Sequence, residues 1–128
     1  MINDPIADML IRIKNAYMAR RTTVEIPYIR VKENLLALLA KEGSVGATEK
    51  IGDRKTLVVK LLYTQYGAAV SDVKRVSKPG LRRYIKASEL PTLHVGLGHV
   101  ILSTPKGLKT HTEARKERVG GEILCRIW

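Results

Sequence analysis

Residues 100–110 read Val100-Ile101-Leu102-Ser103-Thr104-Pro105-Lys106-Gly107-Leu108-Lys109-Thr110. The apolar start predicts a buried strand, and the hydroxyl, cationic and glycine residues that follow predict an exposed turn at its end. Thr110 and Glu113 have the spacing of a helix capping box, so a short helix is expected next. A strand, a turn and a short helix in this order favour a lobe built mainly of strands.

The rest of the second half is predicted to be mostly β-structure. Apolar or alternating runs lie at residues 73–76, 81–86, 99–103 and 122–128, and turn residues separate them. Lys78-Pro79-Gly80 is the clearest turn, and Gly120-Gly121 is expected to end the helix. Residues 73–128 are therefore predicted to form a small antiparallel β unit with one short helix.

The first half has helical periodicity. Asp4 can cap a helix that begins at Pro5, and apolar residues then recur at helical spacing as far as Tyr17. A strand over 23–26, a helix over 31–41 that ends at Gly43, and strands over 45–51 and 56–63 are expected to follow. Residues 1–64 are thus predicted to form an α-β-α-β-β lobe and residues 65–72 a linker. The predicted fold class is α+β, with two small lobes.

The charge indicates a polyanionic partner. The 128 residues include 23 Lys and Arg against 12 Asp and Glu, which gives a formal net charge of +11. The second half is the more basic, with twelve cationic and five acidic residues over 65–128. A surplus of this size favours binding to nucleic acid.

The turn after Leu102 carries groups that suit a ribose-phosphate backbone. RNA duplexes display ribose hydroxyls in a shallow minor groove, so a protein that binds there needs small donors and acceptors. Ser103 and Thr104 supply hydroxyls, Gly107 permits close approach, and Lys106 and Lys109 add charge. The alternative is an ordinary hairpin turn with solvated polar residues.

Two other segments are candidates for the same surface. Alternation along a strand puts Arg82 and Tyr84 on one face, and the preceding turn brings Lys78 near them; the alternative is a solvated strand edge. Gly121 permits a close approach, and Glu122 can either accept hydrogen bonds from RNA or orient a neighbouring serine or arginine. In the alternative interpretation, a glycine caps the helix and Glu122 begins a strand. Cations on the first helix, Arg12 and Lys14, are weaker candidates.

The sequence argues against enzymes, membrane proteins and metal sites. Cys125 could act as a nucleophile with His94, His99 or His111 as base, but it lies in an apolar strand pattern without the surroundings that activate a thiol. No metal-ligand spacing or nucleotide fingerprint is found. The longest apolar run has six residues, so no membrane span or leader is expected. No cofactor or small-molecule substrate is expected either. A single cysteine fits a reducing compartment.

Three blocks of sequence resemble one family. They are Asn3-Asp4-Pro5-Ile6-Ala7-Asp8-Met9-Leu10 with Arg12-Ile13-Lys14-Asn15-Ala16, then Val76-Ser77-Lys78-Pro79-Gly80-Leu81-Arg82, and finally the Ser-Thr-x-Lys-Gly loop with Gly120-Gly121-Glu122. In this order, the blocks resemble bacterial-type small-subunit ribosomal protein number eight from Asn3 to the C-terminus.

The resemblance implies a two-lobed α+β protein that is a structural constituent of the small ribosomal subunit. Such a protein binds a helical region in the central domain of small-subunit rRNA, supports assembly and translation, and contacts neighbouring ribosomal proteins. In bacterial members, the resemblance further implies binding to a similar structure in a ribosomal protein mRNA, which represses translation. The implied location is the ribosome, either cytoplasmic or organellar.

The loop departs from the family pattern at two positions. Many members have a serine where Pro105 stands and an apolar residue where Lys109 stands. Pro105 removes a hydroxyl and an amide donor and fixes the backbone angle. One hydrogen bond of the family is therefore expected to be absent, and rigidity or the charge of Lys109 could compensate for it.

Overall fold

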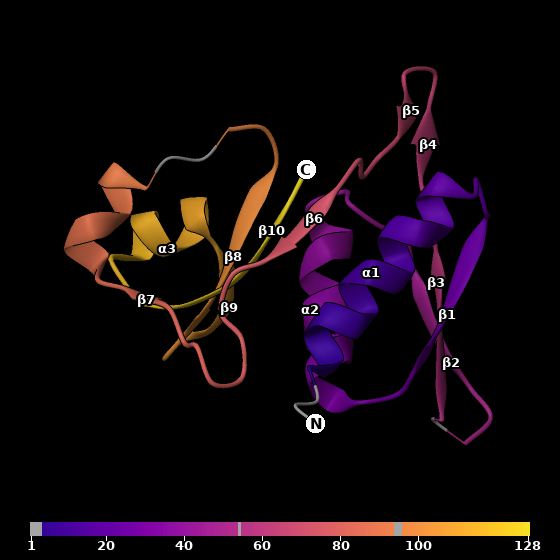
Figure 1. Ribbon diagram of the computed structural model, residues 1–128, viewed down its shortest axis with the longest axis horizontal. Helices are drawn as coiled ribbons and strands as arrows, with labels where there is room; N and C mark the ends of the chain where they lie inside the picture. The colour runs from indigo at the N-terminus through magenta and orange to yellow at the C-terminus, as the bar shows by residue number, and fades with distance from the viewer. Residues whose placement is uncertain (1–3, 54, 94–95) are drawn as a thin grey trace. The chain divides into compact units, whose positions relative to one another are not determined.

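The computed structural model describes residues 4–53, 55–93 and 96–128, so Asn3 and His94 lie outside the described residues. The chain divides into two compact units (Figure 1). One unit contains Pro5–Asp72, and the other contains Val73–Trp128 together with Asp4. The predicted α+β class is confirmed, since both units combine helices with antiparallel strands. The boundaries of lobes and linker stay a prediction.

The unit Pro5–Asp72 follows the predicted order of elements. It contains α1 (Pro5–Met18), β1 (Thr23–Pro27), α2 (Arg30–Lys41), β2 (Thr48–Ile51) and β3 (Thr56–Lys60). The strands form an antiparallel sheet in the order β1-β3-β2, and the two helices lie on one side of it in Figure 1. A further hairpin of β4 (Tyr63–Thr64) and β5 (Gly67–Ala68) reaches into the segment that the sequence predicts to be a linker.

Apolar periodicity explains how these elements pack. The helices bury the residues that recur every three or four positions, and the sheet buries alternate residues such as Leu57 and Val59. The hydroxyl of Tyr17 joins α1 to the segments that follow α2 and β3. The hydroxyl of Tyr17 donates to the carbonyl oxygen of Ser44 at 2.6 Å and accepts from the amide of Leu62 at 3.1 Å.

The second unit is organised around its last strand. It contains β6 (Val73–Arg75), β7 (Tyr84–Ile85), a 3-10 helix η1 (Ala87–Thr92), β8 (His99–Thr104), β9 (Gly107–Thr110), α3 (His111–Glu117) and β10 (Gly121–Ile127). The sheet order is β6-β10-β8-β9, and β7 also pairs with β10. β10 therefore lies between β8 on one side and both β6 and β7 on the other.

A small apolar core lies beneath this sheet. Its buried members are Leu90, Val100, Leu102 and Ala114, which come from η1, β8 and α3. Thr110 caps α3 as predicted, because its hydroxyl accepts from the amide of Glu113 and the Glu113 carboxylate accepts from the amide of Thr110. This cap fixes the end of the hairpin formed by β8 and β9.

Three predictions of local structure were wrong. Residues 107–110 form the strand β9 rather than a loop, since pairing with β8 overrides their weak strand propensity. Only Tyr84–Ile85 of the predicted strand 81–86 are paired as a strand. Gly120-Gly121 does not end α3, because Arg118 takes the left-handed conformation (φ 56°) that closes the helix.

Candidate nucleic-acid interface

Three of the predicted site residues form one row across the sheet. Glu122 in β10 pairs with Ser103 in β8 on one side and with Tyr84 in β7 on the other. Directly opposite residues of antiparallel strands project from the same face of a sheet. The hydroxyl, the carboxylate and the phenol are therefore neighbours. Tyr84 is 71% exposed, so its ring is open to a ligand.

The two hydroxyls of the loop do not share a face. Thr104 follows Ser103 in β8 and projects from the opposite face, where it is 9% exposed. Its hydroxyl donates to the carbonyl oxygen of Gly107 at 2.8 Å and accepts from the amide of Lys106 at 3.1 Å. The Thr104 hydroxyl thus closes the hairpin turn. Lys106 and Gly107 are exposed at the tip, and Gly107 has a φ of +105°, which favours glycine.

Because Thr104 bonds within the turn and Ser103 faces the row, we expect the loss of each hydroxyl to affect a different property, stability or RNA binding. We expect Thr104→Val to lower the free energy of unfolding by about 1–2 kcal/mol, because the turn loses two hydrogen bonds. We expect Ser103→Ala to change it by less than about 0.5 kcal/mol and to weaken RNA binding instead. Urea unfolding followed by circular dichroism measures the first quantity, and RNA titration measures the second. Equal stabilities of the two variants would contradict this assignment.

Lys109 lies away from the row. It pairs with Leu102 of β8, whose side chain is in the core, so both project from the face opposite Ser103. The ammonium group of Lys109 forms an ion pair with Glu117 of α3 at 3.3 Å. The structure therefore brings Lys109 to the helix. Two of the other predicted cations, Lys78 and Arg82, come from the loop that precedes β7.

That loop is a tight cationic turn. Lys78 and Leu81 exchange two backbone hydrogen bonds of 3.0 and 2.9 Å around Pro79-Gly80, and Gly80 has a φ of +85°. Lys78 is exposed, and the guanidinium of Arg82 forms an ion pair with Glu122 at 3.0 Å. An open hollow of about 370 Å³ adjoins the turn; it is lined by Lys74, Arg75, Val76, Lys78, Leu81 and Arg83.

The glycines before Glu122 are needed for strand packing. A Cβ on Gly121 would lie 2.1 Å from the carbonyl oxygen of Ser103, and one on Gly120 would lie 2.3 Å from that of Ile85. Both distances are far inside van der Waals contact. β10 can therefore pass between its neighbours only with glycine at these two positions, and this close passage places Glu122 beside Ser103.

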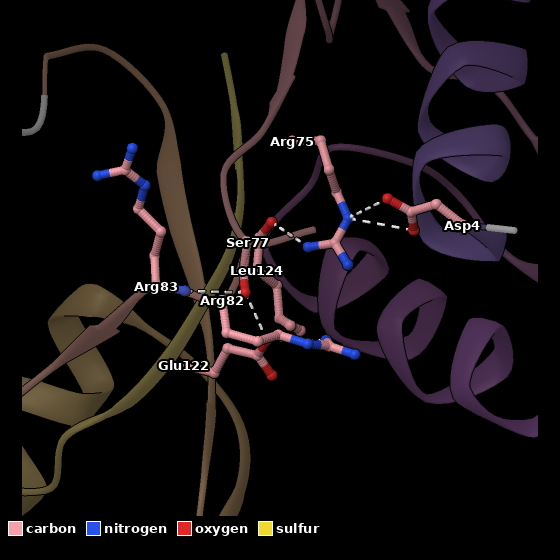
Figure 2. A network of polar contacts seen from close by, with 7 residues as sticks. All are labelled: Asp4, Arg75, Ser77, Arg82, Arg83, Glu122 and Leu124. Atoms are coloured by element: carbon pink, nitrogen blue, oxygen red, sulfur yellow. Dashed lines mark hydrogen bonds and ion pairs between the residues drawn. The ribbon is translucent and has the colours of Figure 1, made fainter. Parts of the chain in front are cut away.

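Glu122 is held by two donors (Figure 2). Its Oε2 accepts from the hydroxyl of Ser77 at 2.5 Å and from Nη1 of Arg82 at 3.0 Å. Burial on its own would raise the pKa of Glu122, but the hydrogen bonds from Ser77 and Arg82 and the charges of Arg82 and Arg75 outweigh it, and the pKa is lowered. Glu122 is consequently ionised at neutral pH. It orients a serine and an arginine, which is one of the two roles predicted for it.

Sequence reasoning missed two residues of this network. Ser77 is fully buried, and the side chain of Arg75 is 9% exposed. The Nε of Arg75 donates to both carboxylate oxygens of Asp4, and its Nη1 donates to the carbonyl oxygen of Leu124 (Figure 2). A signal was present in the sequence, because the polar residues Arg75 and Ser77 flank Val76 where the predicted strand ends, but it did not identify their partners.

Comparison with known proteins places the chain in a family. The family model for ribosomal protein S8 matches residues 4–128. The chain belongs to the ribosomal protein S8 family. The small ribosomal subunit protein uS8 of Persephonella marina is 49% identical over 136 residues, which cover all of both chains. The proteins of the same name from Dictyoglomus thermophilum and Chloroflexus aurantiacus are 49% and 47% identical, each over 99% of this chain and 98% of the relative.

Membership of the S8 family makes this chain a ribosomal protein and not an enzyme. The geometry around Cys125 agrees with this class, because the thiol is fully buried and burial raises its pKa to about 12. His99 and His111 lie with ring centroids 6.4 Å apart. Within the described residues, no cluster of three or more His, Cys, Asp or Glu could hold a metal ion, and no helix is long and apolar enough to cross a membrane.

Proposed function

We propose that this protein is a primary rRNA-binding protein of the small ribosomal subunit and that the second unit carries its main RNA-binding surface. The observation that carries the proposal is the row Tyr84–Glu122–Ser103, which is flanked by the cations Lys78, Arg82 and Lys106. Family membership supports the ribosomal setting. The proposed RNA target is a helical region in the central domain of small-subunit rRNA, as the resemblance implies.

The chemistry of the row suits the minor groove of RNA. A shallow groove lined by ribose hydroxyls favours small groups that both donate and accept, and Ser103 supplies such a group on a flat sheet. The exposed ring of Tyr84 can stack on an unpaired base or pack on a ribose; a stack contributes about 1–3 kcal/mol. Lys106 and Lys78 lie on turns at the two sides of the row, where phosphates would pass.

Glu122 has a defined place in this proposal. Its Oε2 is taken by Ser77 and Arg82, and among the described residues no hydrogen bond uses Oε1. That oxygen is the one we propose to accept from an exocyclic amine or a ribose hydroxyl. A carboxylate on an RNA-binding surface repels phosphate. Glu122, held in place by Ser77 and Arg82, would therefore favour contacts with a base or a ribose at the centre of the row.

Salt dependence tests the proposed surface. If about six phosphates are contacted, affinity for a duplex from the protein's own rRNA should fall with salt at a log-log slope near −5. We expect Lys106→Gln and Arg82→Gln each to reduce the slope by about one. Lys116→Gln in α3 is the matched control, since that exposed lysine lies on a different element. A flat salt dependence, or equal slopes in all four proteins, would contradict the proposal.

Two further measurements test the finer parts of the function. A chemical footprint on small-subunit rRNA should protect a helical region of the central domain, and the protein should co-sediment with small subunits. A protein found mainly in the free pool would argue against a structural role. We also propose that the same surface binds a ribosomal protein mRNA with a similar helix and represses its translation. The Arg82→Gln variant should then lose affinity for the rRNA and for the mRNA by the same factor.

A further inference from the structure

Segment 77–83, the cationic turn, is anchored at both of its ends to one residue of β10, Ile123. The amide of Ser77 donates to the carbonyl oxygen of Ile123 at 3.0 Å, and the amide of Ile123 donates to the carbonyl oxygen of Arg83 at 2.9 Å. The two ends of segment 77–83 are therefore held by the two backbone groups of Ile123. The backbone of the turn is thus fixed against the strand that carries Glu122.

The hydroxyl of Ser77 joins this base to the site. It accepts from the amide of Arg83 at 3.1 Å and donates to Oε2 of Glu122 at 2.5 Å (Figure 2). Ser77 is fully buried, so water cannot replace either contact without a rearrangement. One buried group consequently closes the turn and fixes the position of the carboxylate. Nothing in the proposed contact surface requires Ser77 to touch RNA.

The carboxylate in turn fixes one cation. Segment 77–83 carries Lys78, Arg82 and Arg83, which repel one another, and Glu122 neutralises part of this charge through Arg82. The contact of Arg82 with Glu122 uses Nη1, and a guanidinium has five N–H donors, so others remain for a phosphate. Without the ion pair to Glu122, the half-exposed side chain of Arg82 would sample many rotamers.

We propose that Ser77 is a positioning residue for RNA binding: it orients Glu122, which holds the Arg82 guanidinium ready for a phosphate. The inference rests on the proposed function. Its physical basis is preorganisation, because a side chain that is already held loses less entropy when the RNA binds. Ser77 thus acts through two other residues and not by contact with RNA.

A double-mutant cycle in RNA affinity tests the proposal. We expect Ser77→Ala and Arg82→Gln each to weaken binding to the central-domain duplex by about tenfold, as for one charge-assisted contact. In the Arg82→Gln background, Ser77→Ala should weaken binding clearly less than it does alone, because the guanidinium held through Glu122 is gone and only the contact of Glu122 itself remains. Circular dichroism and urea unfolding of each variant establish that the proteins compared are folded.

A second cycle guards against an unfolded Ser77→Ala variant. Glu122→Gln keeps the shape and the buried serine but weakens the ion pair with Arg82, so the double variant Glu122→Gln/Arg82→Gln should lose less affinity than the sum of the two single losses. An equal loss for Ser77→Ala with and without Arg82, or no loss at all, overturns the positioning role. If Arg82→Gln and Lys106→Gln themselves bind like the unmodified protein, the proposed RNA surface is what fails.

Discussion

Gly121→Ala is expected to lower the free energy of unfolding by more than about 3 kcal/mol, because the added methyl group meets backbone that cannot move. The Cβ would lie 2.1 Å from the carbonyl oxygen of Ser103, 2.9 Å from its carbonyl carbon and 3.1 Å from the Cα of Thr104. These atoms belong to β8, which is paired on its two sides with β10 and β9. To relieve the clash, β10 and β8 would have to separate.

The comparison with Gly96→Ala isolates this cause. A Cβ on Gly96 would lie 2.9 Å from Nη2 of Arg126, the far end of a flexible side chain that can move away. We expect this control to lose less than about 1 kcal/mol of stability. Thermal and urea unfolding of the two variants supply the measurement. If Gly121→Ala unfolds like Gly96→Ala, the close approach of β10 to β8 is not as tight as described.

Glu122→Ala is expected to lower the free energy of unfolding by about 2–4 kcal/mol, because it leaves a buried hydroxyl and a guanidinium without their shared acceptor. The side chain of Glu122 is 18% exposed, and Ser77 is fully buried, so water replaces the lost contacts poorly. RNA binding should weaken as well, since Arg82 loses its partner. Glu117→Ala is the control, because Glu117 pairs with Lys109 on the other face of the sheet.

Protonation of Glu122 in acid should cause part of the loss of stability that is expected for Glu122→Ala. The pKa of Glu122 is below its ordinary value of 4.5 in the folded protein, so the unfolded chain binds the proton more tightly. The stabilisation is therefore complete above that ordinary value and is lost as the pH falls below 4.5 and through the lowered folded pKa. We expect Glu122→Gln to lose less stability than the unmodified protein over this range. Parallel stability profiles of the two proteins in acid would contradict the assignment.

Local patterns carried most of the fold prediction. The positions of α1 and α2 follow from apolar spacing, and the start of α3 follows from its capping box; both signals act within one or two turns of the chain. Strand-forming runs likewise predicted β1, β3, β8 and β10. β9 was missed because Gly107 and its neighbours have little strand propensity, and only pairing with β8 makes them a strand.

The sequence suggested residues for the candidate site but not the hydrogen bonds and ion pairs among them. Composition singled out Ser103 and Tyr84, the family resemblance added Glu122, and the register of β10 then put the three in one row. The pairing of β8 with β9 placed Thr104 at the hairpin turn and Lys109 beside α3, where it forms an ion pair. Alternation along a strand predicts that two adjacent residues face opposite sides, but sequence alone does not say which side is open.

The sequence by itself determined the family, the α+β class, the basic character and the residue types at the proposed surface, because these depend on composition and short-range order. Only the tertiary structure decided that Ser77 and Arg75 support Glu122 and Leu124, and that Gly121 serves close packing and not the end of a helix. The reason is physical. These roles depend on distances between residues more than fifteen positions apart, which strand pairing sets and no local pattern records.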